Sequence, residues 1–308
     1  MKTQQELTLA IRNEAFRLGF SDCGFSRVRK LSECEQTYES WIAKGHNGDM
    51  QYMERNIEKR IDPALLVENA KTVISFLFNY FPSESITGSP YKIAKYAYGD
   101  DYHEVLKAKL FQIDKFIRDN IHNDVSQRCF VDSAPVLERA WAQNSGLGWI
   151  GKNSCLVSRK HGSFVFIAEI ITSLELDYDE SIQDYCGTCR KCIDACPTQA
   201  ITENRTIDSR SCISYQTIEN KTEIPESLSG KFNNFIFGCD ICQDICPWNK
   251  KSHPHTEPLF FLRKKTQDMS LSDWQLMNEE QYKEIFKKSA IKRTKYSGIK
   301  RNIAFVSS

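Results

Sequence analysis

The sequence predicts a mixed α/β fold in two parts, followed by a basic C-terminal segment. Segments typical of helices and of strands alternate along the first 180 residues. Eight of the 12 cysteines lie between Cys186 and Cys246, and the part from Lys250 onward carries 13 Lys or Arg against 6 Asp or Glu. A chain of 308 residues has room for about two domains. We therefore expect units at 1–180, 181–250 and 251–308.

Three segments have the features of helices. At the N-terminus, Thr3 and Glu6 resemble a capping box, and Gly19 stands where this helix should stop. Between residues 106 and 121, Leu and Ile recur at steps of three and four, which places them on one helical face. Residues 271–286 of the basic segment are also expected to be helical.

Three other segments are predicted strands. Thr72–Phe78 and Phe164–Ile171 are rich in β-branched and aromatic residues, and Cys129–Val131 is a shorter run of the same kind. Because these strands alternate with helices, layers of helix and sheet are the expected architecture.

The composition argues against several classes of protein. Lys and Arg number 41, Asp and Glu number 40, hydrophobic residues make up 41%, and the mean hydropathy is −0.48. These values are typical of a folded globular protein and not of a disordered one. The apolar runs are too short to span a membrane, and the polar N-terminus lacks a signal-peptide core. We therefore expect a cytoplasmic protein with no membrane partner.

The spacing of the cysteines is the most specific motif. The run from Cys186 to Pro197 has the bacterial ferredoxin pattern C-x₂-C-x₂-C-x₃-C-P, and a shorter run from Cys239 to Pro247 echoes it. In two-cluster ferredoxins, three close cysteines wrap one [4Fe–4S] cluster and a distant cysteine supplies the fourth ligand. This logic gives one ligand set of Cys186, Cys189, Cys192 and Cys246, and a second of Cys196, Cys212, Cys239 and Cys242.

Two structural zinc sites are the alternative. Zinc sites usually combine two separated C-x₂-C pairs, often with His, whereas no His lies between Cys186 and Cys246. The spacing therefore favours clusters, which transfer single electrons, and the long unit before them suggests a second reaction centre. The other four cysteines are expected to be ordinary, mostly buried residues: Cys23, Cys34, Cys129 and Cys155.

Gly146–Gly151 matches the dinucleotide-binding pattern G-x-G-x-x-G. That interpretation requires a strand before the glycines and a helix after them, but a helical stretch precedes them and Ser154–Ser158 is expected to be extended. Nicotinamide binding is therefore disfavoured. A glycine turn, or the close approach of the backbone to another flat cofactor, remains open.

Asp132 is the most interesting acid in the first unit. It stands just before Ser133 and Pro135, where either Asp132 or Ser133 could cap a helix that starts near the proline. A catalytic acid is the competing role. Asp101-Tyr102-His103 offers a carboxylate, a phenol and an imidazole in a row, although a lone His is more often structural.

The basic segment contains a run that is free of acids, between Ile291 and Asn302. Its charges could form a solvated helix face, or they could contact the phosphates of a nucleic acid, which needs Lys and Arg that are not already paired. The charged residues of this run are Lys292, Arg293, Lys295, Lys300 and Arg301.

Taken together, these segments resemble the epoxyqueuosine reductase family. The matching segments are Ala94–His103, Val131–Arg139, Gly148–Asn153, the ferredoxin-like run, Cys212–Glu219, Gly238–Gln243 and Ile291–Asn302. The resemblance covers nearly the whole chain. It implies an α/β (α+β) N-terminal cobalamin-binding domain similar to flavin-reductase folds, without flavin, and a ferredoxin-like domain with two [4Fe–4S] clusters. Longer members continue into a helical-repeat domain, so the present chain is expected to be a short form.

The resemblance implies the last step of queuosine synthesis, in which an epoxide on a modified base of the tRNA anticodon becomes an alkene. Electrons would pass through the clusters to cobalamin, and Co(I) would attack or reduce the epoxide. Asp132 would protonate the leaving oxygen, for which we expect a raised pKa. The implied cobalamin contacts are Arg60, Lys95, Tyr96, Tyr98, Asp132, Lys152, Asn153, Ser154, Ser214 and Tyr215. The implied tRNA contacts are the five basic residues of the acid-free run.

The implied partners are tRNA that carries epoxyqueuosine and a low-potential electron donor of the flavodoxin or ferredoxin type. The protein is expected to be a monomer. Two other functions stay open: a corrinoid and iron–sulfur reductase of another substrate, similar to a dehalogenase, and a two-cluster electron carrier without catalytic activity.

Overall fold

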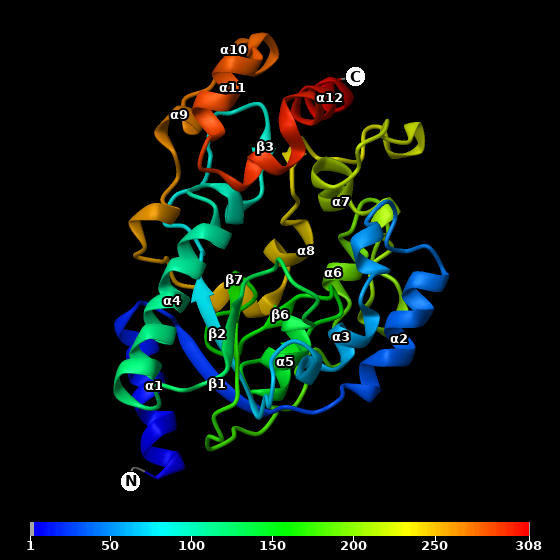
Figure 1. The fold of residues 1–308 in the computed structure, drawn as a ribbon. Helices are drawn as coiled ribbons and strands as arrows, with labels where there is room; N and C mark the ends of the chain where they lie inside the picture. Colours follow the sequence, from blue (N-terminus) through cyan, green and yellow to red (C-terminus); the bar gives the residue numbers. More distant parts are fainter. Residues whose placement is uncertain (1–2, 308) are drawn as a thin grey trace.

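A four-stranded sheet forms the centre of the first unit in the computed structural model, which describes residues 3–307 (Figure 1). The strand order is β1 (Asp22–Arg27), β2 (Thr72–Asn79), β7 (Val165–Thr172) and β4 (Gln127–Phe130), and every pairing is antiparallel. The three predicted strands are thus confirmed. Because the sheet is antiparallel throughout, α+β describes the unit better than a parallel α/β fold.

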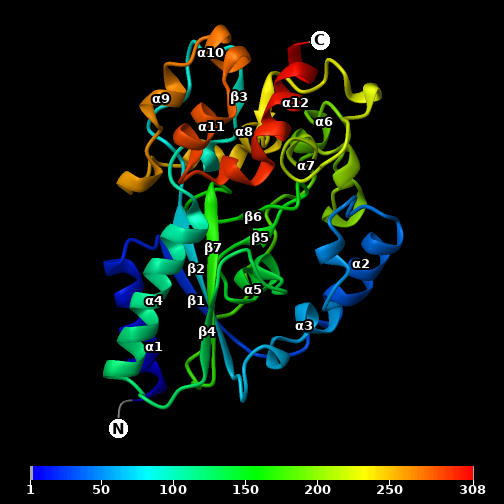
Figure 2. The same ribbon diagram turned by 45° about the horizontal axis from the view of Figure 1, so that its top comes forward.

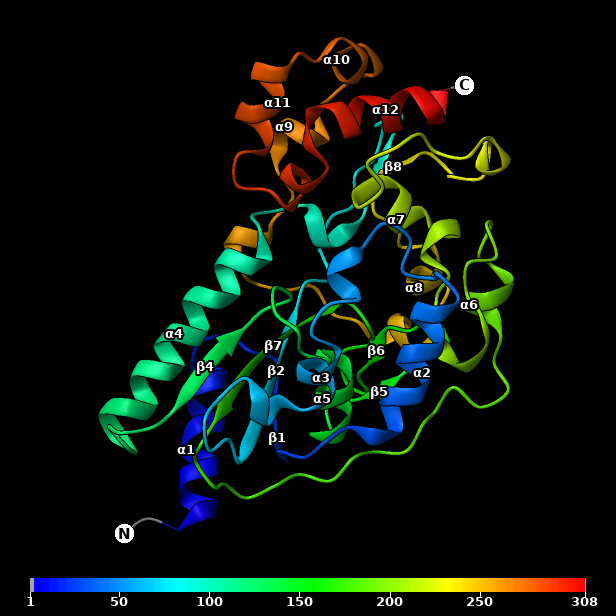
Figure 3. The same cartoon turned by 45° about the vertical axis from the view of Figure 1, so that its right-hand side comes forward.

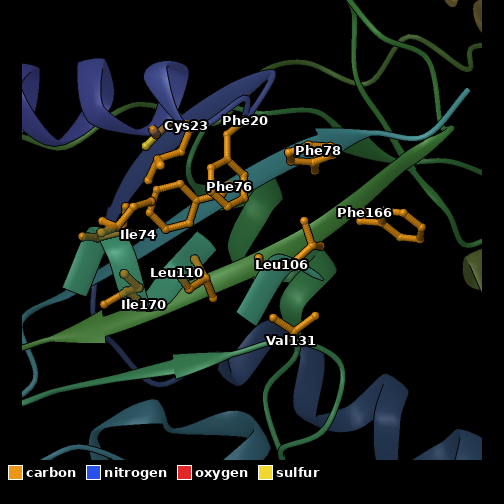
Figure 4. Packing of buried hydrophobic residues seen from close by; sticks show 14 of the residues in the cluster. Phe20, Cys23, Ile74, Phe76, Phe78, Leu106, Leu110, Val131, Phe166 and Ile170 are labelled. Carbon is orange, nitrogen blue, oxygen red and sulfur yellow. The ribbon is translucent and has the colours of Figure 1, made fainter. Parts of the chain in front are cut away.

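Two helices cover one face of this sheet, α1 (Gln4–Arg17) and α4 (Tyr102–Asn120), as Figure 2 shows. Alternate residues of β2 point toward them, and Ile74, Phe76 and Phe78 pack in one buried cluster with the apolar face of α4 (Figure 4). The capping box at the start of α1 and the amphipathic character of α4 are both confirmed.

The opposite face of the sheet packs against α5 (Glu138–Asn144). Val73 of β2 and Trp141 of α5 are fully buried in one cluster here, and Leu77 joins a smaller one. Farther out lie two more helices, α2 (Ser32–Ala43) and α3 (Ile57–Ile61).

The start of α5 differs from the prediction. The helix begins at Glu138, and its N-cap residue is Leu137, so neither Asp132 nor Ser133 caps it. Asp132 instead has φ 47°, in the left-handed region. A residue before proline is also kept out of the helical region, so Pro135 delays the helix.

The glycine motif forms a turn. Gly146 follows α5 with φ 74°, and the hairpin of β5 (Trp149–Ile150) and β6 (Leu156–Val157) comes next. A helix therefore precedes the motif and a strand follows it, which is the reverse of a dinucleotide-binding turn.

A second core joins distant parts of the chain. β3 (Lys92–Ile93) pairs in parallel with β8 (Phe235–Phe237), and the residues around Tyr91 share a buried cluster with the C-terminal helices. Those helices are α10 (Leu271–Leu276), α11 (Glu279–Phe286) and α12 (Lys295–Ser307), and the short α9 (Lys264–Gln267) precedes them. Residues 91–98, which precede the expected boundary at residue 180, therefore pack with β8 and the C-terminal segment.

The cysteine-rich part contains three short helices, α6 (Lys191–Asp194), α7 (Ile213–Ile218) and α8 (Ile241–Asp244). Helix α6 carries Cys192, the third cysteine of the first run, and α8 carries Cys242, the second cysteine of the second run. The two helices pack together. The last helix, α12, lies against α7 and β8 (Figure 3). Within residues 3–307, no helix has the length and apolar character needed to cross a membrane.

Candidate active site

Asp132 presents its carboxylate from a strained loop between β4 and α5. Its backbone N–H donates to Glu138 Oε1 at 2.5 Å, which holds the left-handed turn in place. The side chain is 61% exposed. Tyr102 donates its phenolic hydrogen to Oδ2, and His103 Nε2 lies 3.7 Å from the same oxygen. Within the described part of the chain, Oδ1 has no hydrogen-bond partner.

The start of α4 positions His103 opposite Asp132. Asp101 caps this helix by accepting the backbone N–H of His103 at 3.1 Å, and its Oδ1 lies 2.7 Å from His103 Nδ1. Lys292 Nζ lies 3.0 Å from the other oxygen, Oδ2. Burial opposes ionisation of Asp101, but the hydrogen bonds with His103 and Lys292 lower its pKa to about 2. Asp101 is thus a permanent anion that fixes the imidazole.

The pKa of Asp132 is shifted downward, whereas we expected an upward shift from the sequence. Partial desolvation raises it, but the facing His103 imidazole and the hydrogen bond from Tyr102 outweigh that effect and hold the pKa below its ordinary value. Desolvation likewise lowers the pKa of His103, but Asp101 and Asp132 together raise it to about 9. Near neutral pH the proton of the Asp132–His103 pair therefore resides on the imidazole.

Two further carboxyl groups belong to this neighbourhood, the half-buried Glu138 and the fully buried Glu169. Burial, followed by the charges of Asp132 and Glu169, raises the pKa of Glu138 well above its ordinary value. Glu169 is 0% exposed on β7, and burial raises its pKa to about 8, although a hydrogen bond from Ser75 at 3.2 Å opposes this. A neutral Glu138 can hold the Asp132 backbone without adding a second negative charge beside it.

Several of the residues implied as cobalamin contacts lie near Asp132. Tyr96 meets the Tyr102 ring edge-on, with 6.1 Å between centroids. Arg60 is buried and donates to the Tyr52 carbonyl at 2.8 Å, but its Nε has no partner within residues 3–307. Ser154 accepts two hydrogen bonds from Arg139, which follows Glu138 in α5.

Other implied contacts are engaged elsewhere. Lys95 Nζ lies 2.6 Å from Asp244, and Lys95 lines, with Tyr98, an open pocket of about 490 Å³ that does not include Asp132. Lys152 donates to the carbonyls of Gly187 and Cys189 at 2.7 and 2.9 Å.

The last three lie on the cysteine-rich side. Asn153 donates to the carbonyl of Cys242 at 3.4 Å. Tyr215 accepts the backbone N–H of Asp49 at 2.7 Å through its hydroxyl. The backbone carbonyl of Ser214 accepts the hydroxyl of Thr217 at 3.2 Å. The contacts of Asn153 and Tyr215 therefore join the cysteine-rich unit to the first unit, whereas that of Ser214 lies within α7.

The predicted cluster ligands fall into neighbouring groups. Burial, with the adjacent Cys186 and Cys189 thiols, raises the pKa of Cys246. Burial, with Cys242 and Cys196 nearby, raises the pKa of Cys212 to about 11. These neighbours belong to the two sets that the spacing predicts.

Cys192 lies between the two groups. Its pKa is raised to about 11 by burial first and then by Cys242, Cys186 and Cys246. Among the described residues, no three His, Cys, Asp or Glu side chains converge on a point that a single metal ion could occupy. Eight soft thiol ligands fit two iron–sulfur clusters in number and chemistry.

Cys155 is not the ordinary buried residue that we expected. Its thiol interacts with that of Cys242, and this interaction lowers the pKa of Cys155 and raises that of Cys242. It follows the Gly148–Asn153 segment, so this part of the first unit reaches the second group of cysteines. The two thiols are brought together by the tertiary fold, which the spacing of cysteines in the sequence does not reveal.

Four of the five basic side chains of this run have partners, either acidic side chains or backbone carbonyls. The sequence alone shows only that the run itself contains no acids. Lys292 pairs with Asp101 and with Glu104 at 2.8 Å, and Arg293 pairs with Glu219 at 2.9 Å. These acids are distant in sequence, which is why a search for local pairing misses them.

The remaining three basic residues differ from one another. Arg301 donates to the backbone carbonyls of Gln216, Asn220 and Thr222, and burial lowers its pKa. Lys300 donates to a backbone carbonyl in α10. Lys295 is exposed and, within residues 3–307, forms no salt bridge. Of the five basic residues of the run, Lys295 is therefore the one whose ammonium group has neither a salt bridge nor a hydrogen bond within residues 3–307.

Sequence reasoning underrated Tyr102 and His103 and missed Glu138. The signal for the first two was the acid–phenol–imidazole triplet at a helix start, where a capping Asp orients the residue two positions later. Glu138 gave no signal, because its role depends on the left-handed turn at Asp132.

Two family models match the chain. One is described as "Epoxyqueuosine reductase QueG, DUF1730" and matches residues 60–133, and the other, "4Fe-4S double cluster binding domain", matches residues 185–249. The epoxyqueuosine reductase of Cellulophaga algicola is 52% identical over 306 residues, which cover 99% of this chain and 100% of that protein. The chain belongs to the epoxyqueuosine reductase family.

More distant members of the family agree. The epoxyqueuosine reductase of Escherichia coli is 38% identical over 97% of this chain and 80% of its own length. A crystal structure of an epoxyqueuosine reductase with an epoxyqueuosine-modified tRNA-Tyr stem loop superposes with a TM-score of 0.90 at 27% identity, over 99% of this chain and 81% of that one. A Bacillus subtilis member with the same TM-score is described with its catalytic aspartate loop swung out of the active site.

A B12-dependent reductive dehalogenase shares the fold at lower similarity. Its TM-score is 0.51 at 17% identity, over 80% of this chain and 32% of that chain. The likeness concerns the fold alone.

Proposed function

We propose that this protein reduces epoxyqueuosine to queuosine in the tRNA anticodon, with two [4Fe–4S] clusters and cobalamin as its cofactors. The observation that carries the proposal is the open Asp132 carboxylate, held by Tyr102 and His103 at the border with the cysteine-rich unit. The full-length match to the epoxyqueuosine reductases supports the same activity.

The residues of the site fit a bulky, amide-rich cofactor. The Tyr96 ring, which contacts Tyr102, the Ser154 hydroxyl, which contacts Arg139, and the unpartnered Arg60 Nε offer aromatic and polar contacts to such a group. When bound, cobalamin supplies a low-potential nucleophilic metal and the clusters supply single electrons. We propose that the two predicted sets of four cysteines hold the clusters.

Asp132 and His103 would together manage the proton. The reaction consumes two electrons and two protons, forms the alkene and releases water. An epoxide oxygen leaves well only when it receives a proton. His103 Nε2, which lies 3.7 Å from Asp132 Oδ2, would first transfer its proton to the Asp132 carboxylate, and the carboxyl group would then give that proton to the epoxide oxygen. Asp132 thus relays a proton that His103 stores, and a raised pKa on Asp132 is not required.

The remaining parts of the proposal concern partners. The basic segment would contact tRNA, with Lys295 free to meet a phosphate and with the half-exposed Lys292 and Arg293 able to share one. A low-potential carrier of the flavodoxin or ferredoxin type would supply electrons. A tRNA substrate supports a cytoplasmic location, and we propose that the protein acts as a monomer.

The test is anaerobic reconstitution with iron, sulfide and cobalamin, followed by incubation with epoxyqueuosine-containing tRNA and reduced methyl viologen. Mass spectrometry of the digested nucleosides should show loss of one oxygen, and only when cobalamin is present. No conversion with both cofactors bound would point to another corrinoid substrate. Failure to bind cobalamin would favour the two-cluster electron carrier.

His103→Gln is expected to change the pH profile of the reaction. Below about pH 9 the wild-type imidazole is protonated and can supply the proton, so the single-turnover rate should fall as the pH rises through about 9. The variant should lose this alkaline limb and react more slowly at neutral pH. His122→Gln, on an exposed turn, is the control. An unchanged alkaline limb in His103→Gln would remove His103 from the proton path.

A further inference from the structure

The predicted ligand group of Cys186, Cys189, Cys192 and Cys246 lies at the outer surface of the protein. Cys189 is exposed, whereas the other predicted ligands are at least partly covered. The whole stretch 187–191 is exposed as well. We propose that electrons enter the protein here, through a docking face for an acidic one-electron carrier protein. This inference rests on the proposed function, because it takes the cysteines as cluster ligands.

Three aromatic rings pack against this outer group. Trp149 donates its indole N–H to Cys186 Sγ at 3.4 Å and is itself buried. Its ring centroid lies 5.2 Å from that of Tyr185 and 4.9 Å from that of Trp248, and those two are 5.7 Å apart. Tyr185 is 37% exposed and directly precedes Cys186. The rings therefore connect the outer group to the surface, and aromatic residues are enriched in protein interfaces.

Cations surround these rings. Arg159 lies over the Tyr185 ring at 5.5 Å and Lys251 over the Trp248 ring at 5.2 Å. Lys191 is exposed beside Cys192. Within residues 3–307 none of these three forms a salt bridge, unlike Lys292 and Arg293 of the C-terminal run. The face therefore carries uncompensated positive charge beside an exposed cysteine, which would steer an acidic partner toward it.

The acids near this face are largely neutralised. Asp184 Oδ2 pairs with Arg205 at 2.5 Å. Asp194 lies 3.6 Å from Arg190, and both side chains are about two-thirds exposed. Neither acid cancels the charges over the two rings.

The inner group of cysteines faces the active site instead. Asp240, next to Cys239, accepts the backbone N–H of Lys95 at 2.8 Å, and a Cβ on Gly238 would come within 3.3 Å of the Tyr96 ring. Tyr96 contacts Tyr102, which holds Asp132. Electrons would thus pass from the outer to the inner group and then to the catalytic centre.

Each encounter would transfer one electron. The reduced carrier loses an electron, the outer [4Fe–4S] cluster gains it, and no bond forms or breaks. Two encounters supply the two electrons that the epoxide reduction consumes. A tRNA would also be attracted by positive charge, but its modified base must reach Asp132, which lies beyond the inner group. The aromatic rim beside an exposed cysteine therefore favours the carrier.

The test uses the reconstituted holoenzyme with Arg159, Lys191 and Lys251 all changed to Ala. Stopped-flow bleaching of the cluster absorbance would be followed with reduced flavodoxin, and with reduced methyl viologen, a small cation that needs no docking face. The control variant changes three exposed lysines elsewhere that form no salt bridge within residues 3–307: Lys107, Lys264 and Lys287. Iron and sulfide content verifies that the clusters are intact.

We expect the rate constant with flavodoxin to fall about tenfold or more in the test variant and its salt dependence to weaken. Methyl viologen should reduce both variants at the wild-type rate. The proposal would be overturned if flavodoxin reduced the test variant as fast as the wild type, or if the control variant lost as much of its rate with flavodoxin as the test variant. The proposal would also be overturned if the test variant bound tRNA more weakly but reacted with flavodoxin at the wild-type rate, because the face would then be a tRNA-binding surface. Failure of the proposed function is separate, because it appears as a wild-type holoenzyme that methyl viologen reduces but that leaves epoxyqueuosine unchanged.

Discussion

Asp132→Asn is expected to lower the rate of epoxyqueuosine reduction by about 10²–10⁴-fold, since a positioned general acid contributes a factor of that size. An amide at this position keeps the shape of the side chain and can still meet Tyr102 and His103, but it cannot pass a proton from His103 to the epoxide oxygen. The rate would be measured in single turnover, with tRNA nucleosides analysed by mass spectrometry.

Two controls separate chemistry from folding in this variant. Iron and sulfide content should equal that of the wild type, because the carboxylate ligates no cluster, and rates would be compared per bound cobalamin because Asp132 is an implied cobalamin contact. Asp124→Asn, on an exposed loop between α4 and β4, should react at the wild-type rate. A fully active Asp132→Asn variant would show that the proton comes from another group and would return His103 and Tyr102 to structural roles.

Arg301→Met should be the most destabilising change within the basic run. The guanidinium satisfies the carbonyls of Gln216, Asn220 and Thr222 at 2.7, 2.8 and 2.5 Å, all in or just after α7. Methionine keeps part of the apolar stem but leaves these acceptors without a donor. The expected loss is about 3 kcal/mol of unfolding free energy, after allowance for the partial exposure of the site.

The matched control is Lys295→Met, which removes one exposed and unpaired charge from the same helix and should leave the thermal unfolding midpoint unchanged. Lys295→Met should instead weaken tRNA binding and reduce its salt dependence, as expected for one phosphate contact. If Arg301→Met unfolded at the wild-type temperature and lost tRNA affinity, the carbonyl contacts would be incidental and Arg301 would belong to the RNA surface.

The strands and the main helices could be predicted because their signals are local. The apolar runs that became β2 and β7 are continuous, and the apolar spacing of α4 follows the helical period. The cysteine spacing was equally informative, because cluster ligation constrains sequence distance directly.

The errors arose where distant segments meet. No local pattern shows that Asp101 and Glu104 neutralise Lys292, or that the Cys155 thiol reaches Cys242. The lowered pKa of Asp132 likewise depends on a histidine about 30 positions earlier, presented by another helix. Electrostatics of this kind are set by tertiary structure, so motifs identify the residues but not their protonation.

The place of α12 also determines the order in which the protein can be completed. The Asn302 amide bridges the carbonyls of Thr217 and Ile236 at 2.8 Å each, so the last helix ties α7 to β8. Chains are synthesised from the N-terminus at about 5–20 residues per second, and domains form as their residues emerge. All the predicted cluster cysteines are therefore made several seconds before this tie exists. The tie between α7 and β8 is therefore added only after every predicted cluster ligand has been synthesised.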